Sequence, residues 1–392
     1  MCGPKIITHD DFNAGFLEAS IKTYGNGGNY VASPMSVLVL MSALLTAKGP
    51  QNDTATEICE ALVGRTKKHT CTDEADYKEV VSLLEKIRTV VETAKSPEGK
   101  SALKISNAAF IEESLLVKDL FIKKFTYFHG DTVKRTRFNN LDAFENINKW
   151  ANTVTDGLIP RYLNSKDELP EDTLLVLLNA ITFKDEWAEP FYSNFTSHRN
   201  FHLSKDETIR VPMMDMESDM YYFEDEVCKV VNKPFRDSRF SFVIYLPKED
   251  FELKDIEAKM VKEDFVWLKE SAHKFYEPVR LILPKFKVEH RLDLKPILQL
   301  LGIRSIFTRG VANLKGISSD VDLYASGAKQ VAMMEVDEGG ARAAAVTGIE
   351  LSSRFGFSPT PELFIVNRPF YCAIFDNQLQ MPLFIARIVD PR

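Results

Sequence analysis

Two histidines four residues apart, His198 and His202, are the first candidates for metal chemistry. On a helix this spacing would place both imidazoles on one face, where they could bind Zn²⁺. The residues between them, Arg199-Asn200-Phe201, do not favour a helix, and no acidic third ligand follows at a suitable spacing. We therefore expect strand or surface histidines here, and the sequence predicts no metal and no cofactor.

The sequence lacks the usual motifs of catalysis. It has no Gly-x-x-x-x-Gly-Lys-Ser/Thr phosphate loop, no Gly-x-Gly-x-x-Gly, no His-Glu-x-x-His and no Gly-x-Ser-x-Gly. Because no nucleophile and base are paired in any of these patterns, we expect that the protein is not an enzyme.

The balance of charge excludes some partners. Lys and Arg number 49 against 56 Asp and Glu, a net charge of −7, so nucleic acid is not expected. No apolar run approaches the ~20 residues that cross a bilayer, so we expect no membrane partner. Two basic groups could bind a glycosaminoglycan, although solvated surface is the commoner role. They are Arg65, Lys67, Lys68 and His69, and Lys123, Lys124, Lys134, Arg135 and Arg137.

Cysteine usage and the first residues bear on location. The five cysteines are widely spread and form no Cys-x-x-Cys: Cys2, Cys59, Cys71, Cys228 and Cys372. We therefore expect reduced thiols rather than a disulfide framework. The first ten residues lack the apolar stretch of a secretory signal, which favours the cytoplasm, with release without a signal peptide as a variant. An extracellular location is the alternative if a leader precedes this sequence. The sequons at Asn52 and Asn194 are interpreted as chance matches.

One segment, residues 338–361, differs from the rest of the chain. It separates two strand signals, residues 331–336 and 363–367, by more than twenty residues, whereas structureless loops beyond about 12–15 residues are uncommon and usually functional. Its first half is rich in Ala and Gly, and its second half presents Arg354 beside Phe355. A flexible linker would be richer in Ser, Pro and charge, and a helix between its glycines would be too short to persist.

The same segment has the pattern of a strand that could enter a sheet. Read with a period of two, one face carries Ala341, Ala343, Ala345, Thr347 and Ile349, and the other carries Arg342, Ala344, Val346 and Glu350. Residues 339–358 contain no proline, so every amide could join a ladder. We therefore interpret the segment as an exposed loop that could become an internal strand.

The elements predicted to position this loop are mostly helices in the first part of the chain and strands in the later part. Ser33-Pro34 is a helix start, and the apolar residues 37–45 that follow must be buried on all sides. Further helices are predicted over residues 54–63, 73–93, 118–128 and 142–154. Strands are predicted over residues 174–183, 240–246, 279–286, 331–336, 363–367, 371–375 and 383–389. This order favours an α+β fold, and the absence of repeats or linkers favours one domain over residues 1–392.

The sequence resembles the serpin family over nearly its whole length. The hinge is similar to the family pattern Glu-x-Gly-Thr-Glu-Ala-Ala-Ala, and residues 364–370 are similar to Phe-x-Ala-Asp-x-Pro-Phe. Segments at residues 29–36, 178–187, 283–286 and 293–303 also match in order. The resemblance implies about nine helices, three β-sheets and a reactive-centre loop near residues 338–361. The start of the chain resembles the intracellular ovalbumin-type branch.

The resemblance also implies a mechanism and a site. A protease cleaves the loop, forms an acyl-enzyme, and is trapped covalently when the loop inserts into the large sheet. The family's reactive bond lies sixteen places after the hinge glutamate, here at Arg354–Phe355, so trypsin-like serine proteases are the expected partners of a monomeric inhibitor. Phe355 or Phe357 could serve chymotrypsin-like enzymes. The implied hinge and inserting residues are Glu338, Gly339, Gly340, Ala341, Arg342, Ala343, Ala344, Ala345, Val346 and Thr347.

Two departures from the family bear on this expectation. Ala341 and Arg342 stand where the family often has Thr and Glu, but only Ala341 would face the sheet, so no charge is buried. Gln330 stands where the family commonly has histidine, in a sheet-opening region with Ser33, Ser36, Asn179 and Trp187. Gln330 can still donate and accept hydrogen bonds. A non-inhibitory serpin, such as a carrier, storage or chaperone-like protein, is the alternative.

Overall fold

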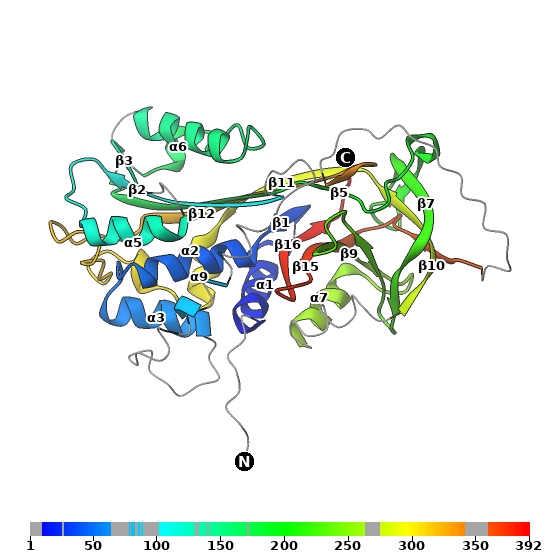
Figure 1. Cartoon of the computed structure of the whole chain (residues 1–392), viewed down its shortest axis with the longest axis horizontal. Helices are drawn as coiled ribbons and strands as arrows, with labels where there is room; N and C mark the ends of the chain where they lie inside the picture. Colours follow the sequence, from blue (N-terminus) through cyan, green and yellow to red (C-terminus); the bar gives the residue numbers. More distant parts are fainter. Residues whose placement is uncertain are drawn as a thin grey trace, which may run out of the picture.

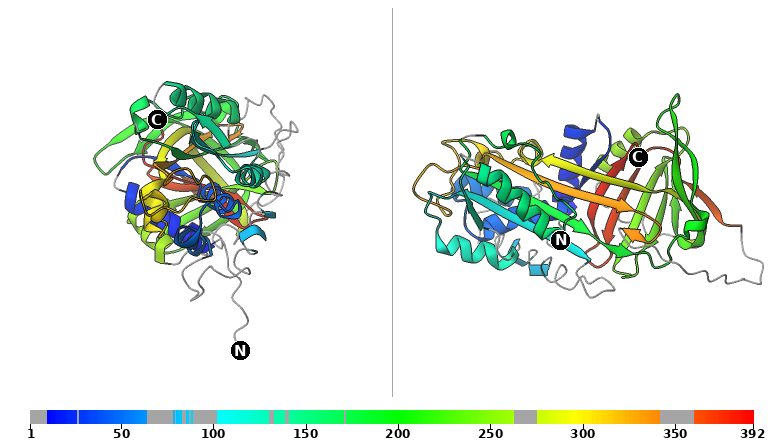
Figure 2. Two further views of the ribbon diagram at one scale, coloured as in Figure 1. Left: turned by 90° about the vertical axis from the view of Figure 1, so that its left-hand side faces the viewer. Right: turned by 90° about the horizontal axis from the view of Figure 1, so that it is seen from above.

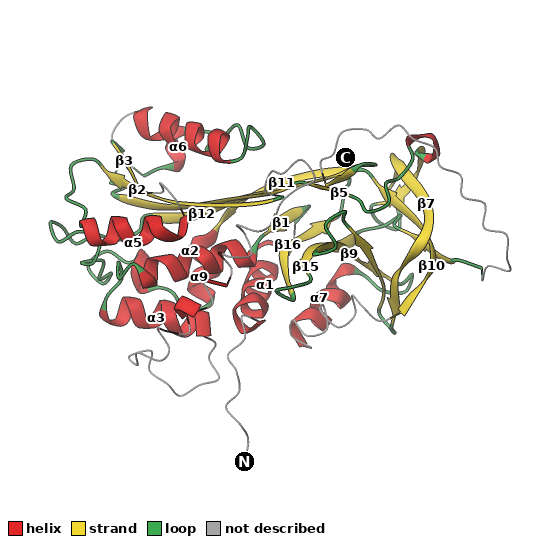
Figure 3. Ribbon diagram, viewed as in Figure 1, coloured by secondary structure: helices red, strands yellow, loops and turns green. Residues whose placement is uncertain are grey.

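The computed structural model describes residues 10–25, 27–63, 78, 80–82, 85–86, 88, 102–129, 133–138, 141–170, 172–262, 275–341 and 360–392. A long sheet runs lengthwise through the molecule and has helices on both of its faces (Figures 1 and 3). A second sheet lies at the end of the molecule that carries β7 and β10. This arrangement confirms the predicted α+β class.

The long sheet has seven strands, and the boundary between its neighbouring strands β4 and β12 is called the seam here. The strand order is β3-β2-β4-β12-β13-β5, with β11 beside β12. Their bounds are β2 (Leu103–Glu112), β3 (Val133–Thr136), β4 (Leu175–Phe183), β5 (Asp185–Glu186), β11 (Phe286–Asp293), β12 (Gly327–Val336) and β13 (Gly340–Ala341). From above, the long strands run side by side along the molecule (Figure 2). Strands β4 and β12 are parallel, paired from Val176↔Gly327 to Ile181↔Ala332.

Nine strands form the second sheet. They are β1 (Tyr30–Ala32), β6 (Ser197–His202), β7 (Thr208–Glu224), β8 (Cys228–Pro234), β9 (Phe240–Pro247), β10 (Phe275–Pro284), β14 (Glu362–Ile365), β15 (Phe370–Asp376) and β16 (Met381–Ile388). The 17-residue β7 pairs with β6 and β10 and also with β8. Strand β7 pairs with β6 through its first residues and with β8 through its last, so hydrogen bonds join these nine strands into a single sheet. The described strands therefore form two sheets in all, where the resemblance implied three.

Seven α-helices have bounds within the described residues. They are α1 (Asp10–Tyr24), α2 (Pro34–Thr46), α3 (Asn52–Val63), α5 (Asp119–His129), α6 (Leu141–Val154), α7 (Leu253–Lys262) and α9 (Leu294–Leu300). Helix α6 lies on one face of the long sheet, and α2, α3 and α5 lie on the other (Figure 1). None of the described helices is long and apolar enough to span a membrane.

Helix α2 confirms the prediction made from its sequence. Every residue of α2 is buried, since it contacts both β4 and β16. The side chain of Ser33 caps it by accepting a hydrogen bond from the Ser36 amide at 3.2 Å, and Pro34 begins the first turn. An apolar helix with no polar face is stable only between such layers.

The structure differs from the strand predictions in two ways. The strand predicted over residues 279–286 is two strands in different sheets, because β10 ends at Pro284 and β11 begins at Phe286. Lys285 makes the crossing, and its amide donates to the carbonyl of Pro212. Strands β2, β3, β6, β7 and β8 were not predicted, because partly exposed polar residues interrupt their apolar alternation. The helix predicted over residues 73–93 falls mostly outside the described residues.

Candidate functional site: the hinge and the sheet seam

Residues 337–341, called the hinge turn here, fold back from the end of β12. The amides of Gly339 and Gly340 donate to Asp337 Oδ1 at 2.9 and 3.2 Å, an Asx-type turn. Ala341 then pairs with Val336 on one side and with Asp185 on the other. Strand β13 is therefore antiparallel to both neighbours and lies between β5 and β12.

The hinge turn is packed closely and without space for larger side chains. Ala341 is 2% exposed, and Gly339 and Gly340 are buried. A Cβ on Gly340 would lie 2.2 Å from the carbonyl oxygen of Asp185, so glycine is required where these two backbones meet. The start of the loop is thus already built as a strand.

The chain after β5 holds this turn through its backbone. The amide of Trp187 donates to the Gly339 carbonyl at 2.9 Å, and the amide of Phe191 donates to the Glu338 carbonyl at 2.9 Å. The Trp187 indole Nε1 also donates to the Asp337 carbonyl at 2.9 Å. Trp187 is itself fixed, since it stacks on Phe235 with ring centroids 4.6 Å apart. The position of the hinge turn therefore depends on this aromatic cluster.

Glu338 joins the hinge turn to the second sheet. Its Oε2 lies 2.6 Å from Lys285 Nζ, and its Oε1 accepts from the Thr196 hydroxyl at 2.9 Å. Burial alone would raise the pKa of Glu338, but the hydrogen bonds from Lys285 and Thr196 outweigh it and hold the pKa below its ordinary value. The carboxylate is therefore ionised at neutral pH. The sequence analysis missed three residues of this site. Lys285 and Thr196 are far from Glu338 in the sequence, and Asp337, which is adjacent to Glu338, belongs to no motif.

Exchanging this pair of charges tests how strongly it fixes the hinge turn. Glu338→Lys or Lys285→Glu alone places like charges together at a partly buried site, so we expect each to lower the melting temperature by about 3–6 °C. The double variant restores opposite charges and should recover most of the loss. Thermal melts of the four proteins check this, and a double variant no more stable than the sum of the single changes would contradict it.

A buried hydrogen-bond network lies beneath the seam between β4 and β12. Ser33, Ser36, Asn179 and Gln330 are each 0% exposed. Gln330 Nε2 donates to Asn179 Oδ1 at 2.7 Å and to Ser36 Oγ at 2.9 Å, and the Ser33 amide donates to Gln330 Oε1 at 2.8 Å. Asn179 Nδ2 donates to Oδ1 of Asn107, a residue the sequence gave no reason to include, at 2.6 Å. Since Asn179 and Gln330 are paired across the seam, the seam cannot open without breaking this network.

Comparison with known proteins accounts for this arrangement. A family model described as Serpin (serine protease inhibitor) matches residues 8–391. Serpin A3-1 of Bos taurus is 32% identical over 372 residues, which cover 93% of this chain and 84% of that protein. A serine protease inhibitor of Cyanea capillata is 29% identical and covers 95% of both chains. The chain belongs to the serpin family.

Solved structures agree with this assignment. A serpin from the trematode Schistosoma haematobium is 28% identical with a TM-score of 0.85, covering 99% of this chain and all of that chain (100%). Human thyroxine-binding globulin complexed with thyroxine is 26% identical with a TM-score of 0.83, covering 98% and 99%. Serpins are generally protease inhibitors, but the second structure shows that the fold also carries a small ligand.

The structure groups the expected site residues of this serpin differently from the sequence analysis. Ser33, Ser36, Asn179 and Gln330 lie together under the seam, as described above. Trp187 does not join them, because it lies beyond the end of β4 and contacts the hinge turn. Glu338, Gly339, Gly340 and Ala341 form that turn. Residues 342–347, Arg354 and Phe355 lie outside the described residues.

A buried lysine lies behind the hinge of this serpin. Lys233 is 1% exposed, and its Nζ donates to the Glu189 carbonyl at 2.7 Å. The ammonium faces the rings of Trp187 and Phe191 at 5.2 and 5.0 Å from their centroids. Burial lowers the pKa of Lys233 to about 7, and the charge of Glu189 offsets this only in part. The lysine thus sits under the two residues whose amides hold the hinge turn.

Removing this lysine is expected to stabilise the protein in a pH-dependent way. The pKa falls from 10.5 to about 7 on folding, so the cost of burying the ammonium appears as the pH falls below 10.5 and reaches its full size below about 7. Lys233→Met should raise the melting temperature by about 5 °C at pH 7, and the gain should shrink toward pH 9.5. Melts across this range check it, with Lys229→Met on the same strand as the control. An equal gain at every pH would contradict the assignment.

The remaining candidates have surface roles in the described residues. His198 and His202 lie on strand β6, which confirms the strand interpretation. Among the residues that the structure describes, no group of His, Cys, Asp and Glu could hold a metal ion. Arg137 pairs with Glu113 at 2.5 Å, and Arg135 donates to the Leu115 carbonyl at 2.9 Å. The basic group at residues 65–69 lies outside the described residues.

One cysteine corrects the expectation of five reduced thiols. Cys228 and Cys372 are free and buried, but Cys59 in α3 is disulfide-bonded. Its partner lies outside the described residues. Sequence spacing could not reveal this bond, because disulfide formation depends on which cysteines the fold brings within reach.

Proposed function

We propose that this serpin inhibits trypsin-like serine proteases as a suicide substrate and is not itself a catalyst. The observation that carries the proposal is strand β13. Gly340 and Ala341 are already paired in the sheet between β5 and β12, with Ala341 buried. A severed loop would therefore extend an existing strand rather than start a new one, which avoids the cost of a first pairing.

The chemistry of the first step follows that of a protease substrate. The protease serine attacks the carbonyl carbon of Arg354, the bond to Phe355 breaks, and the serine proton is passed through the protease histidine to the amine of Phe355, which leaves. Arg354 remains bound to the serine as an ester. The arginine suits a primary pocket with a carboxylate at its base, which selects trypsin-like enzymes.

Insertion would then trap this ester. The new strand would run antiparallel to both β4 and β12, as β13 already runs antiparallel to β12 and to β5, the short strand that follows β4. About fifteen residues at about 3.3 Å each would carry the protease roughly 50 Å toward the opposite end of the sheet. Distortion of the protease during this movement would remove the geometry that deacylation needs.

Incubation with trypsin tests the proposal. We expect a denaturation-resistant complex on a gel and a cut after Arg354 when the released peptide is sequenced. A cut after Phe355 or Phe357 by chymotrypsin is the secondary specificity that the sequence leaves open. Quantitative cleavage without a complex would contradict inhibition and support the non-inhibitory alternative, a carrier or storage protein, which the similarity to thyroxine-binding globulin makes concrete.

Location and further partners form a separate part of the proposal. The sequence favoured the cytoplasm and the ovalbumin-type branch, whereas the Cys59 disulfide favours an oxidising, extracellular environment. We propose the extracellular alternative, and assay of the medium of expressing cells against the cell lysate tests it. Glycosaminoglycan binding is the weaker proposal, since Arg135 and Arg137 already have partners within the protein.

A further inference from the structure

A turn just before β6, called the sequon turn here, carries the sequon Asn194-Phe195-Thr196. Its centre is the 3₁₀ helix η2 (Ser193–Phe195), which packs against β7. Two backbone hydrogen bonds close it, because the Phe195 amide donates to the Tyr192 carbonyl at 2.9 Å and the Thr196 amide donates to the Ser193 carbonyl at 3.0 Å. Ser193, Asn194 and Phe195 are exposed. An ordered turn therefore presents the sequon asparagine to solvent.

Two aromatic rings lie in the sequon turn beside Asn194. Phe195 is 57% exposed, and among the residues that the structure describes it is the one phenylalanine with a largely exposed side chain. Its ring packs edge to face against the ring of Tyr192, with centroids 6.4 Å apart. Covering such a ring removes apolar surface from water, which is favourable by about 25 cal/mol per Å². The C–H groups on one face of a sugar ring offer a matching apolar surface.

The other side chains of the sequon leave the asparagine available. Within the described residues, nothing forms a hydrogen bond with the Asn194 side chain. The Thr196 hydroxyl donates to Glu338 Oε1 at 2.9 Å and so anchors the sequon turn to the hinge turn. A sequon needs a hydroxyl at this third position while the glycan is attached. Because attachment precedes folding, one hydroxyl serves both purposes in turn.

The Cys59 disulfide places the chain where such attachment takes place. A chain that forms disulfides passes through an oxidising compartment, so the ground for a chance match at Asn194 no longer holds. The second sequon, Asn52-Asp53-Thr54, contains no aromatic residue. Asn52 is exposed, but Thr54 is buried, and its hydroxyl accepts from the Asn313 amide at 3.0 Å. Of the two sequons, only that of Asn194 joins an exposed asparagine to exposed aromatic surface.

We propose that Asn194 carries an N-linked glycan whose first sugar covers the rings of Phe195 and Tyr192. The donor is an oligosaccharide joined through a diphosphate to a lipid, and an oligosaccharyltransferase catalyses the transfer. Asn194 Nδ2 forms a bond to the anomeric carbon of the first sugar, and the bond from that carbon to the diphosphate breaks. The amide nitrogen gives up one proton to the transferase, and the lipid diphosphate leaves with the electron pair. This rests on the proposed extracellular location and not on the proposed inhibition of proteases.

Mass spectrometry of the protein isolated from its source organism tests the site. Digestion of the denatured protein with trypsin releases Asn194 within residues 185–199 and Asn52 within residues 49–65, so each sequon lies alone in one peptide. Enzymatic removal of the glycan in heavy-oxygen water converts a modified asparagine into a labelled aspartate. We expect the label at Asn194. An unlabelled peptide in extracellular protein would overturn the glycan alone, whereas unlabelled protein found only inside cells would overturn the location as well.

Thermal melts of protein from secretory cells test whether the sugar covers the rings. Asn194→Gln removes the glycan and retains the bond from Thr196 to Glu338, so we expect a melting temperature lower by about 2 °C. Phe195→Ser keeps the sequon, and in that background Asn194→Gln should have little further effect. An equal loss in both backgrounds would overturn the contact with the rings.

Two controls separate the glycan from the side chain that carries it. In protein from the bacterial periplasm, which lacks this modification, Asn194→Gln should leave the melting temperature unchanged. Asn52→Gln in protein from secretory cells should also leave it within about 1 °C, since no ring belongs to that sequon. A loss from Asn194→Gln in the bacterial protein would show that the asparagine itself stabilises the turn, and would overturn the assignment of the effect to the glycan.

Discussion

Arginine at position 341 or 343 is expected to abolish the proposed inhibition of trypsin and to leave the protein a substrate that trypsin cleaves. The sequence pattern assigns both positions to the face of the loop that would enter the sheet, and Ala341 is already buried there. An unpaired buried guanidinium costs several kcal/mol, enough to slow insertion by at least about a hundredfold. Cleavage after Arg354 should continue at an unaltered rate, because the reactive bond is unchanged. Gel analysis of the trypsin reaction measures the ratio of complex to cleaved protein.

A matched control separates burial from charge alone. Ala344→Arg makes the same substitution on the opposite face of the strand, where the side chain would point to solvent, and it should form the complex as the unaltered protein does. Ala341→Arg could also disturb the hinge turn in the uncut protein, so Ala343→Arg is the more direct variant. Equal complex formation by Ala343→Arg and Ala344→Arg would contradict insertion with the predicted faces.

Replacing Arg354 is expected to reduce the rate of association with trypsin by at least about a hundredfold. In the proposed reaction the guanidinium would make the charge-assisted contact with the carboxylate of a trypsin-like pocket, and a pocket built for that contact strongly rejects a side chain that lacks it. Arg354→Ala removes the contact and leaves the inserting residues unchanged. Second-order rate constants with trypsin measure the effect.

The other arginine of the loop provides the control for this prediction. Arg342→Ala changes the same kind of residue at a position that the sequence pattern assigns to the other face of the strand, and it should leave the rate with trypsin within about threefold. Arg354→Phe should in turn favour chymotrypsin. If Arg354→Ala inhibits trypsin as fast as the unaltered protein, the reactive bond lies elsewhere in the loop.

Local sequence determined several parts of this fold. The capped start at Ser33-Pro34 and the apolar residues after it predicted a buried α2, because a cap and an all-apolar helix depend on neighbours within a few residues. The alternation of small residues after Gly340 predicted a loop able to join a sheet, and β13 lies at its start. In the same way, the apolar run at residues 174–183 predicted the central strand β4, whose residues are all buried.

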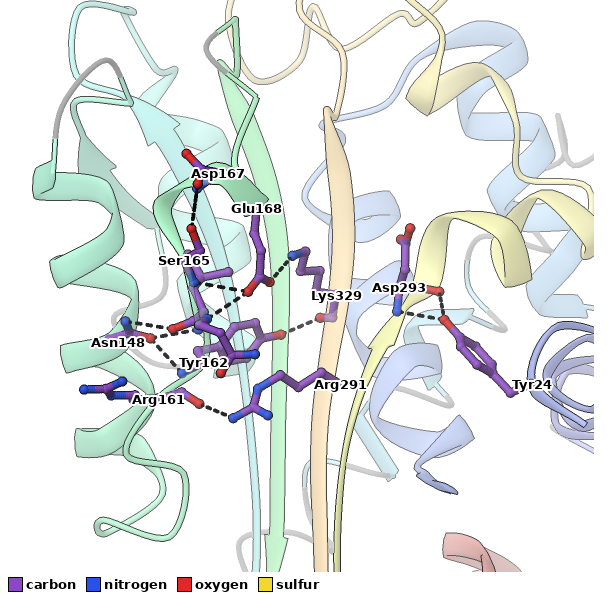
Figure 4. Close-up of polar contacts among 12 residues, drawn as sticks. Tyr24, Asn148, Arg161, Tyr162, Ser165, Asp167, Glu168, Arg291, Asp293 and Lys329 are labelled. Carbon is purple, nitrogen blue, oxygen red and sulfur yellow. Dashed lines mark hydrogen bonds and ion pairs between the residues drawn. The ribbon is translucent and has the colours of Figure 1, made fainter. Parts of the chain in front are cut away.

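Only the tertiary structure determined which polar side chains meet. Glu338 and Lys285 are 53 positions apart, and Thr196 and Glu338 are 142 apart. Tyr162, whose hydroxyl donates to the Lys329 carbonyl, is 167 positions from it (Figure 4). Each contact depends on strand register and on the path of the chain between sheets, which no local pattern encodes. For this reason the sequence could group Trp187 with the other residues of the sheet-opening region, but only the fold shows that Trp187 contacts the hinge turn, whereas Asn179 and Gln330 meet between β4 and β12.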